Sequence, residues 1–150
     1  MRALILCLSL FLLSACGESS VSKTGSTTSA EVPEKIAVKF FEAILVENDI
    51  KKARKYAVPS LGRVLDSFSS GKAAGRTLLN MKFDEVVITV EDTNKSVREF
   101  YTDKADVMLI FTGTYDGGKR VDMRMVKMVV DKGNWLISEI KTDPFARTGV

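Results

Sequence analysis

The sequence predicts a single α+β domain, in which N-terminal helices pack on one face of a curved antiparallel sheet of about four strands. Apolar residues recur with a helical spacing over residues 33–68, and from residue 82 onward they recur at every second position. With 150 residues, 45% of them hydrophobic, the chain is long enough for one such core and an N-terminal appendage.

The start of the appendage has the layout of a secretory signal peptide. Arg2 precedes an uncharged run, Ala3 to Leu13, and the small pair Ser14-Ala15 follows it. The run is shorter than the about 20 residues that cross a bilayer. A core helix is the alternative, but such a helix has a polar face, which this run lacks. We therefore expect residues 1–15 to be cleaved.

The motif Leu13-Ser14-Ala15-Cys16 resembles the lipobox of bacterial lipoproteins. The resemblance implies cleavage between Ala15 and Cys16, a diacylglycerol on the Cys16 thiol, and often a further acyl chain such as palmitate. Two or more acyl chains anchor a protein stably in the lipid bilayer. A disulfide or catalytic thiol is the alternative for Cys16, but the other cysteine, Cys7, lies in the segment expected to be removed. The protein is therefore expected to be exported and membrane-anchored. An aspartate directly after the cysteine would resemble the inner-membrane retention signal of enteric bacteria. Gly17 stands there instead, which favours the periplasmic face of the outer membrane if the cell is Gram-negative.

Residues 16–32 are expected to form the lipidated cysteine and a flexible linker. Serine, threonine and glycine dominate this stretch, and its few apolar residues cannot offset the entropy cost of ordering it. A random coil of about sixteen residues spans about 20–25 Å on average. The domain is thus expected to stay near the membrane surface.

The domain is expected over residues 33–150, with a short C-terminal tail, and to begin with a helix. Pro33 suits a first helical turn, and Asn48-Asp49 ends the helical pattern. Between them lies a wide apolar stripe suited to burial, made of Ile36, Ala37, Phe40, Phe41, Ile44 and Leu45.

Two shorter helices are expected next. Asp49 is placed to cap the first of them, and Pro59 ends it because the residue before a proline avoids helical geometry. Ser60 is expected to cap the second. The expected ranges are residues 50–57 and 61–68 for these helices, 69–75 for a loop and 76–80 for a short helical turn.

The remaining apolar pattern has the period of strands. Val86, Ile88 and Val90 alternate with more polar residues. Three further strands are expected within residues 104–143, joined by turns at Asp116-Gly117-Gly118 and Asp131-Lys132-Gly133-Asn134.

The middle one of these three strands changes phase. Apolar residues occupy odd positions from Val121 to Met125 and even positions from Val126 to Val130. This shift predicts a β-bulge between Met125 and Val126 that bends the long strand.

The domain resembles nuclear transport factor 2-like proteins. The matching segments are FFEAI (Phe40–Ile44), the following Asn48-Asp49, and KKARKYA (Lys51–Ala57). The closing hairpin, DKGNWLISEI, is similar to that family's last strands, where an aromatic residue such as Trp135 follows a turn. The resemblance implies a cone-shaped, cystatin-like α+β fold whose bent sheet wraps a long helix and can leave a pocket. Such a likeness indicates a fold and assigns no function.

No catalytic motif is present, and we expect no catalytic residue, metal ion or cofactor. The chain has no histidine, the commonest general base near neutral pH. In enzymes of the nuclear transport factor 2-like superfamily, which the domain resembles, histidine, aspartate or a tyrosine–aspartate pair commonly transfers the proton. We interpret the available tyrosines and aspartates as surface or rim residues: Tyr56, Tyr101, Tyr115, Asp106 and Asp122. An enzyme that uses a carboxylate or tyrosine in the domain pocket is the alternative.

The expected function is a non-enzymatic binding module for a small hydrophobic ligand or an envelope protein. The candidate pocket or partner-surface residues are Phe40, Phe41, Met108, Met123, Met125, Met128 and Trp135. Methionine adapts to varied apolar ligands, whereas ordinary core packing explains the same alternation. Both parities of the long strand cannot face one small interior, so Met123 and Met125, or Val126 and Met128, are expected to be exposed. A cystatin-like protease inhibitor would need an exposed wedge loop, for which the sequence has no candidate.

The basic cluster Lys51–Lys55 has two interpretations. It can contact anionic lipid headgroups near the anchor, or it can be a solvated helix face. The net charge of +3 falls to +2 when Arg2 is removed, which is too small for a nucleic-acid surface. The expected partners are therefore the lipid bilayer, through Cys16, and an envelope protein or hydrophobic ligand.

Overall fold

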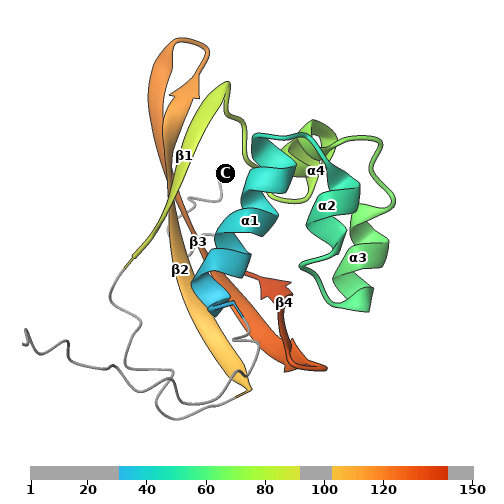
Figure 1. Ribbon diagram of the computed structural model, residues 1–150. Coiled ribbons are helices and arrows are strands. Elements are labelled where there is room, and N and C mark those ends of the chain that lie inside the picture. The colour runs from blue at the N-terminus through green and yellow to red at the C-terminus, as the bar shows by residue number, and fades with distance from the viewer. Residues whose placement is uncertain (1–30, 92–102, 142–150) are drawn as a thin grey trace, which may run out of the picture.

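The computed structural model describes residues 31–91 and 103–141, and it confirms the α+β class (Figure 1). The described helices are α1 (Pro33–Leu45), α2 (Ile50–Arg54), α3 (Pro59–Leu65) and α4 (Gly71–Thr77). The strands are β1 (Glu85–Val90), β2 (Lys104–Tyr115), β3 (Gly118–Asp131) and β4 (Asn134–Ile140). They form one open antiparallel sheet in the order β1-β2-β3-β4, with the helices on one face. The expected signal peptide, Cys16, the linker up to residue 30 and the C-terminal tail lie outside the described residues.

Helix α1 lies across the sheet and supplies much of the core. The expected apolar stripe is buried except at Leu45, which is partly buried, and Phe40, Phe41 and Ile44 are fully enclosed. The Phe41 ring meets the Phe111 ring of β2 edge to face, with centroids 5.0 Å apart. We call the face of the sheet that contacts α1 the inner face, and the opposite one the outer face.

Helix α2 has a side-chain N-cap, whereas α3 begins with a proline and has none. Asp49 caps α2 as expected, because its carboxylate accepts a hydrogen bond of 2.9 Å from the Lys52 backbone N–H. The expected Ser60 cap is wrong: α3 begins at Pro59, and Val58 precedes it without a side-chain cap. Proline favours the first helical position because its missing N–H would be unpaired there in any case.

The segment between α2 and α3 extends the sheet. Ile137 of β4 donates its backbone N–H to the Tyr56 carbonyl at 2.8 Å and accepts from the Val58 N–H at 3.0 Å. These bonds give an isolated parallel bridge between Ala57 and Ile137 and cover part of the β4 edge.

The expected loop over residues 69–75 is wrong, because most of it belongs to α4. The Ser70 hydroxyl caps this helix by accepting from the Ala73 N–H at 3.2 Å. The contact at Gly71 explains why this helix contains a glycine at its first position. A Cβ on this residue would lie 2.3 Å from the Ile44 carbonyl oxygen, so only glycine lets α4 approach the end of α1 this closely.

The expected strands and turns are confirmed. Val86, Ile88 and Val90 pack against the core, whereas Glu85, Val87 and Thr89 are exposed. Both hairpins turn through two residues with positive φ, namely Asp116-Gly117 and Lys132-Gly133. Positive φ at both positions matches the tight turns that suit the twist of antiparallel strands.

The expected bulge between Met125 and Val126 is wrong. Strand β3 pairs with β2 without interruption from Gly118 to Val129. The register shift instead occurs in the pairing with β4, where Lys127 faces Glu139 and Met128 faces Ile137. Ser138 is therefore the extra residue, and its hydroxyl donates to the Lys127 carbonyl at 3.0 Å.

Candidate functional site

The structure divides the candidate binding residues between the two faces of the sheet. Phe40, Phe41 and Met128 are almost completely buried in the core beneath α1. Trp135 is partly buried opposite Val130, and it packs against the same core. The interior that could have held a small ligand is therefore occupied by large side chains at these positions.

Met108, Met123 and Met125 lie together on the outer face. Met108 pairs directly with Met125 across β2 and β3, and the neighbouring pair is Ile110 with Met123. All four side chains are half-buried. We call this group the methionine face. The alternative in which Val126 and Met128 are exposed is wrong, because both are buried on the inner side.

Exposed valines extend the methionine face at one end. Val87 of β1 and Val121 of β3 are 65% and 66% exposed, and both pair with Thr112 of β2 between them. Directly opposed residues in an antiparallel sheet share a face. The methionine face and these two valines thus lie on one side of three neighbouring strands, with Thr112 between the valines.

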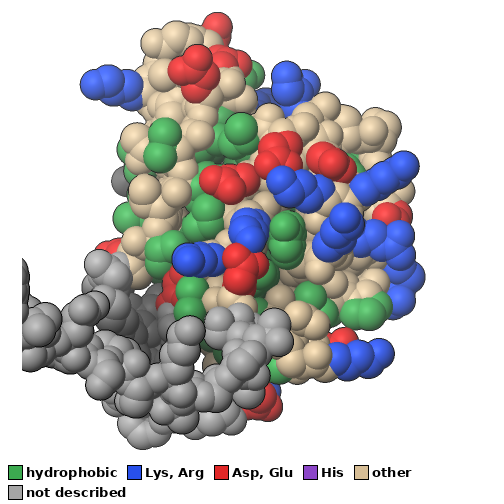
Figure 2. Space-filling model, in the orientation of Figure 1, with side chains coloured by type: hydrophobic (Ala, Val, Ile, Leu, Met, Phe, Trp, Pro, Cys, Tyr) green, Lys and Arg blue, Asp and Glu red, His purple; other side chains and the backbone are tan. Residues whose placement is uncertain are grey.

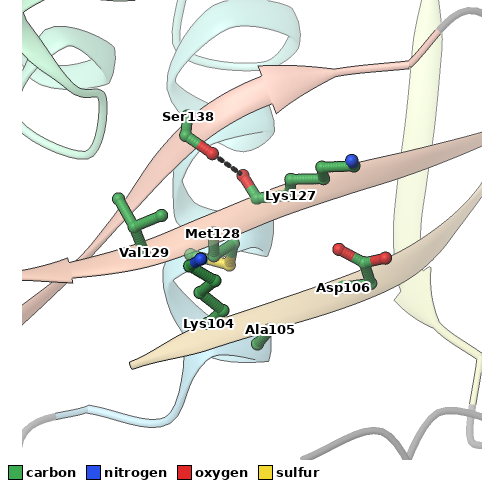
Figure 3. A pocket seen from close by; sticks show the side chains of 7 residues that line it. All are labelled: Lys104, Ala105, Asp106, Lys127, Met128, Val129 and Ser138. Atoms are coloured by element: carbon green, nitrogen blue, oxygen red, sulfur yellow. Dashed lines mark hydrogen bonds between the residues drawn. The ribbon is translucent and has the colours of Figure 1, made fainter. Parts of the chain in front are cut away.

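A hollow with a mixed apolar and charged lining lies beside Asp106 and Lys127 (Figure 3). Its volume is about 310 Å³, and its lining includes Lys104, Asp106, Lys127, Met128 and Ser138. Asp106 pairs with Lys127 one step beyond the pair Met108 and Met125 on the same face. The outer face therefore combines an apolar area with charged groups at its edge.

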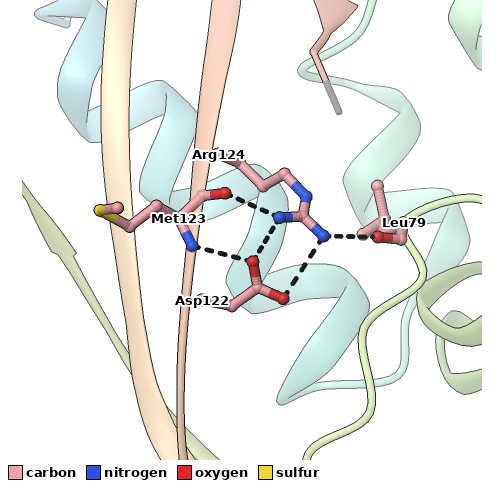
Figure 4. A network of polar contacts seen from close by, with 4 residues as sticks. All are labelled: Leu79, Asp122, Met123 and Arg124. Carbon is pink, nitrogen blue, oxygen red and sulfur yellow. Dashed lines mark hydrogen bonds and ion pairs between the residues drawn. The ribbon is translucent and has the colours of Figure 1, made fainter. Parts of the chain in front are cut away.

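A buried ion pair lies on the inner face of the sheet (Figure 4). Asp122 and Arg124 have side chains only 9% and 7% exposed, and two Arg124 nitrogens meet both Asp122 carboxylate oxygens. Arg124 also donates to the Met123 carbonyl at 2.7 Å and to the Leu79 carbonyl at 3.1 Å. The expectation that Asp122 faces solvent is wrong.

The sequence carried a signal for this pair that the apolar alternation obscured. Residues two positions apart on a strand share a face, so Asp122 and Arg124 necessarily point the same way. Their presence on the inner face also explains the phase change. The odd positions remain on the outer face throughout β3, and the two polar residues merely occupy inner positions before Val126.

Among the described residues, Asp122 has no hydrogen bond to Tyr56, Tyr115 or Asp106. Tyr115 is 39% exposed, and the Lys82 ammonium nitrogen lies 6.0 Å from its ring centroid. Tyr56 is partly buried, and Tyr101 lies outside the described residues. Asp106 is half-buried on the outer face. Within residues 31–91 and 103–141, no three acidic or cysteine side chains are placed to hold a metal ion.

The basic segment Lys51–Lys55 forms most of α2 and the residue after it. Lys52 donates to the Glu47 carboxylate at 2.5 Å, and this hydrogen bond raises the pKa of Lys52. Arg54 pairs with Asp66 at 3.0 Å, and Lys51 and Lys55 are exposed.

Helix α1, with 13 residues, is the longest that the structure describes, and none of the described helices has the length and apolar character to cross a membrane. The chain matches no protein-family model, no curated protein sequence and no solved structure.

Proposed function

We propose that this protein is a bacterial lipoprotein, anchored in a membrane of the cell envelope through Cys16, and that its domain is a non-enzymatic binding module. Its methionine face captures an apolar segment of another envelope protein. The observation that carries this proposal is the contrast between the two faces of the sheet. Helices and core side chains cover the inner face, and no described helix lies on the methionine face.

The character of this face supports a protein partner over a small enclosed ligand. Contiguous exposed apolar area on a soluble domain commonly marks an interaction surface. Met108, Met123 and Met125 have flexible, polarizable side chains that adjust to an incoming apolar surface. A small ligand beneath α1 would instead have to displace fully buried rings such as Phe40 and Phe41.

The lipid anchor is supported by the N-terminal sequence. Arg2, the apolar run up to Leu13 and the motif Leu13-Ser14-Ala15-Cys16 have the order found in exported lipoproteins. Lipidation at Cys16 and export to the periplasmic face of an outer membrane complete this proposal. The order of elements, with α1 packed across a meander of four strands, supports a nuclear transport factor 2-like fold.

The proposal of a binding role over an enzymatic one is supported by the contacts of Asp122. Both of its carboxylate oxygens contact Arg124, and one of them also accepts from the Met123 backbone N–H at 2.8 Å. A general base must reach the proton that it abstracts, and this carboxylate is engaged within the fold.

Site-specific photocross-linking in bacterial cells tests the binding role. A photoreactive residue at Val121 is expected to form a covalent adduct with one discrete protein, because this position adjoins the methionine face. The same photoreactive group at Val46 is the matched control. Val46 is 60% exposed and Val121 is 66% exposed, but Val46 lies at the end of α1, away from the methionine face.

The adduct must also depend on the methionines. Met123→Gln combined with Met125→Gln is expected to reduce it at least about tenfold, since each change replaces apolar contact area by a polar amide. Equal adducts at Val121 and Val46, or an adduct that persists in the double variant, would contradict the proposed surface.

A further inference from the structure

The surface formed by α2 and α3 is basic, with the exposed carboxylates of Asp49 and Asp66 at its two ends. From Ile50 to Leu65 the chain has five basic residues and no acidic one. The whole chain has a net charge of only +3, so the remainder carries a net charge of −2. Lysine and arginine side chains gather over α2 and α3 in the space-filling view (Figure 2).

Two of the five cations have structural partners. Lys52 pairs with Glu47 and Arg54 with Asp66. The Arg54 stem also lies over Gly62 of α3, where an added Cβ would be 3.3 Å from Arg54 Cγ. These two residues therefore help to hold α2 against its neighbours.

The other three cations are Lys51, Lys55 and Arg63, and we call them the basic surface. All three are exposed, and none has an ion-pair partner among the described residues. Lys51 and Lys55 are four positions apart, which places them on one side of the helical turn. Val64, next to Arg63, is 44% exposed, so an apolar side chain lies beside these cations.

The basic surface and the methionine face lie on opposite sides of the domain. Helix α1 separates α2 and α3 from β1 and β2 (Figure 1). A flat partner that covers the basic surface would therefore leave the methionine face open.

We propose that the basic surface docks the domain on an anionic lipid leaflet, through the headgroup phosphates. This inference rests on the proposed membrane anchor. Each basic residue near an anionic leaflet strengthens membrane association about fivefold. A linker of about sixteen residues spans about 20–25 Å on average and keeps the domain within reach of the headgroups. Docking in this orientation points the methionine face away from the membrane, toward a protein partner.

Lysine labelling of the full, lipidated chain in vesicles tests this orientation. The chain is placed in vesicles of phosphatidylcholine, or of phosphatidylcholine with an equal amount of phosphatidylglycerol, and treated with an amine-reactive reagent read by mass spectrometry. In the anionic vesicles, Lys51 and Lys55 are expected to react about fivefold more slowly. Lys119 and Lys132, exposed at the ends of the hairpins, are the internal controls and should react equally in both.

Salt and charge variants separate lipid docking from other causes of protection. At about 1 M salt the Debye length is only about 3 Å, so the protection should disappear. Arg63→Glu should weaken the protection of Lys51 and Lys55. Arg76→Glu, the same charge change at an exposed position of α4, should leave it unchanged.

Several results would overturn the docking. Equal labelling in the two kinds of vesicle would do so, and so would protection that persists at high salt. Protection by added acidic proteins on neutral vesicles would assign the basic surface to a protein partner instead. Flotation with the vesicles reports the anchor separately: a chain that does not float with neutral vesicles contradicts the anchor, whereas one that floats with unchanged labelling contradicts the docking alone.

Discussion

Arg124 and Asp122 lie two residues apart on β3 and form an ion pair on the inner face of the sheet, with side chains 7% and 9% exposed. Arg124 also donates to the Leu79 carbonyl beyond the end of α4. The pair thus joins the sheet to the helical layer at a site that apolar residues would otherwise fill.

Arg124→Met is expected to lower the free energy of unfolding by about 3–5 kcal/mol, because it leaves the Asp122 carboxylate buried without its partner. Urea unfolding followed by circular dichroism measures this on the fragment from Glu31 onward, which contains all the described helices and strands. The double variant Asp122→Val with Arg124→Met should recover most of the loss, since apolar residues often replace a buried ion pair without cost. Losses that simply add in the double variant would show that the two residues act independently.

Gly113→Ala is expected to destabilise the domain by about 1–3 kcal/mol, because the position has no room for a side chain. A Cβ there would lie 1.9 Å from the Glu85 carbonyl oxygen and 2.9 Å from the Phe83 ring. The pairing of β1 with β2 should loosen, and faster amide hydrogen exchange in β1 would report it. Gly118→Ala is the control, since its nearest neighbour is the Tyr115 carbonyl oxygen at 3.5 Å. Equal effects at the two glycines would exclude the steric explanation.

Phe41→Ala should remove about 3–5 kcal/mol of stability, because it empties a fully enclosed site beside the Phe111 ring. The midpoint of urea unfolding reports the change. Val87→Ala, at a position 65% exposed on the outer face, should stay within about 0.5 kcal/mol of the parent protein. A comparable loss from Val87→Ala would contradict the assignment of the core to the inner face.

Cys16→Ser, expressed in a bacterium, should leave an unprocessed precursor that no longer incorporates labelled palmitate. The reason is that the thiol accepts the diacylglycerol before the signal segment is cleaved, as the resemblance to the lipobox implies. Gel mobility and palmitate labelling measure the two effects. Cys7→Ser, the only other cysteine change that the chain allows, is the control and should be processed normally. Normal maturation of the Cys16 variant would contradict the anchor.

Helix α1 could be predicted from the residue pattern of its own segment, whereas α4 could not. The stripe that contains Phe40 and Ile44 identified α1, because burial on one side repeats with the helical period. Helix α4 has no such stripe. Its glycines lower helix propensity, and they are tolerated because Gly71 fits against the Ile44 carbonyl, a contact that appears only when α1 and α4 are together.

The residue pattern of one strand is also insufficient to place the candidate site. Alternation along β3 separates Met123 and Met125 from Val126 and Met128, but it does not say which set α1 covers. The hollow beside Asp106 and Lys127 also depends on contributions from three strands.

By itself the sequence determined the α+β class, the order of α1, α2 and α3 and of the four strands, and the positions of both hairpin turns, because each depends on residues close together in the chain. Only the tertiary structure decided that Asp122 is buried against Arg124, that Met108, Met123 and Met125 face outward, and that the extra residue on β4 is Ser138. These features depend on which surfaces meet. A strand pattern specifies two faces, and the face that becomes interior is chosen by the free energy of packing against elements elsewhere in the chain.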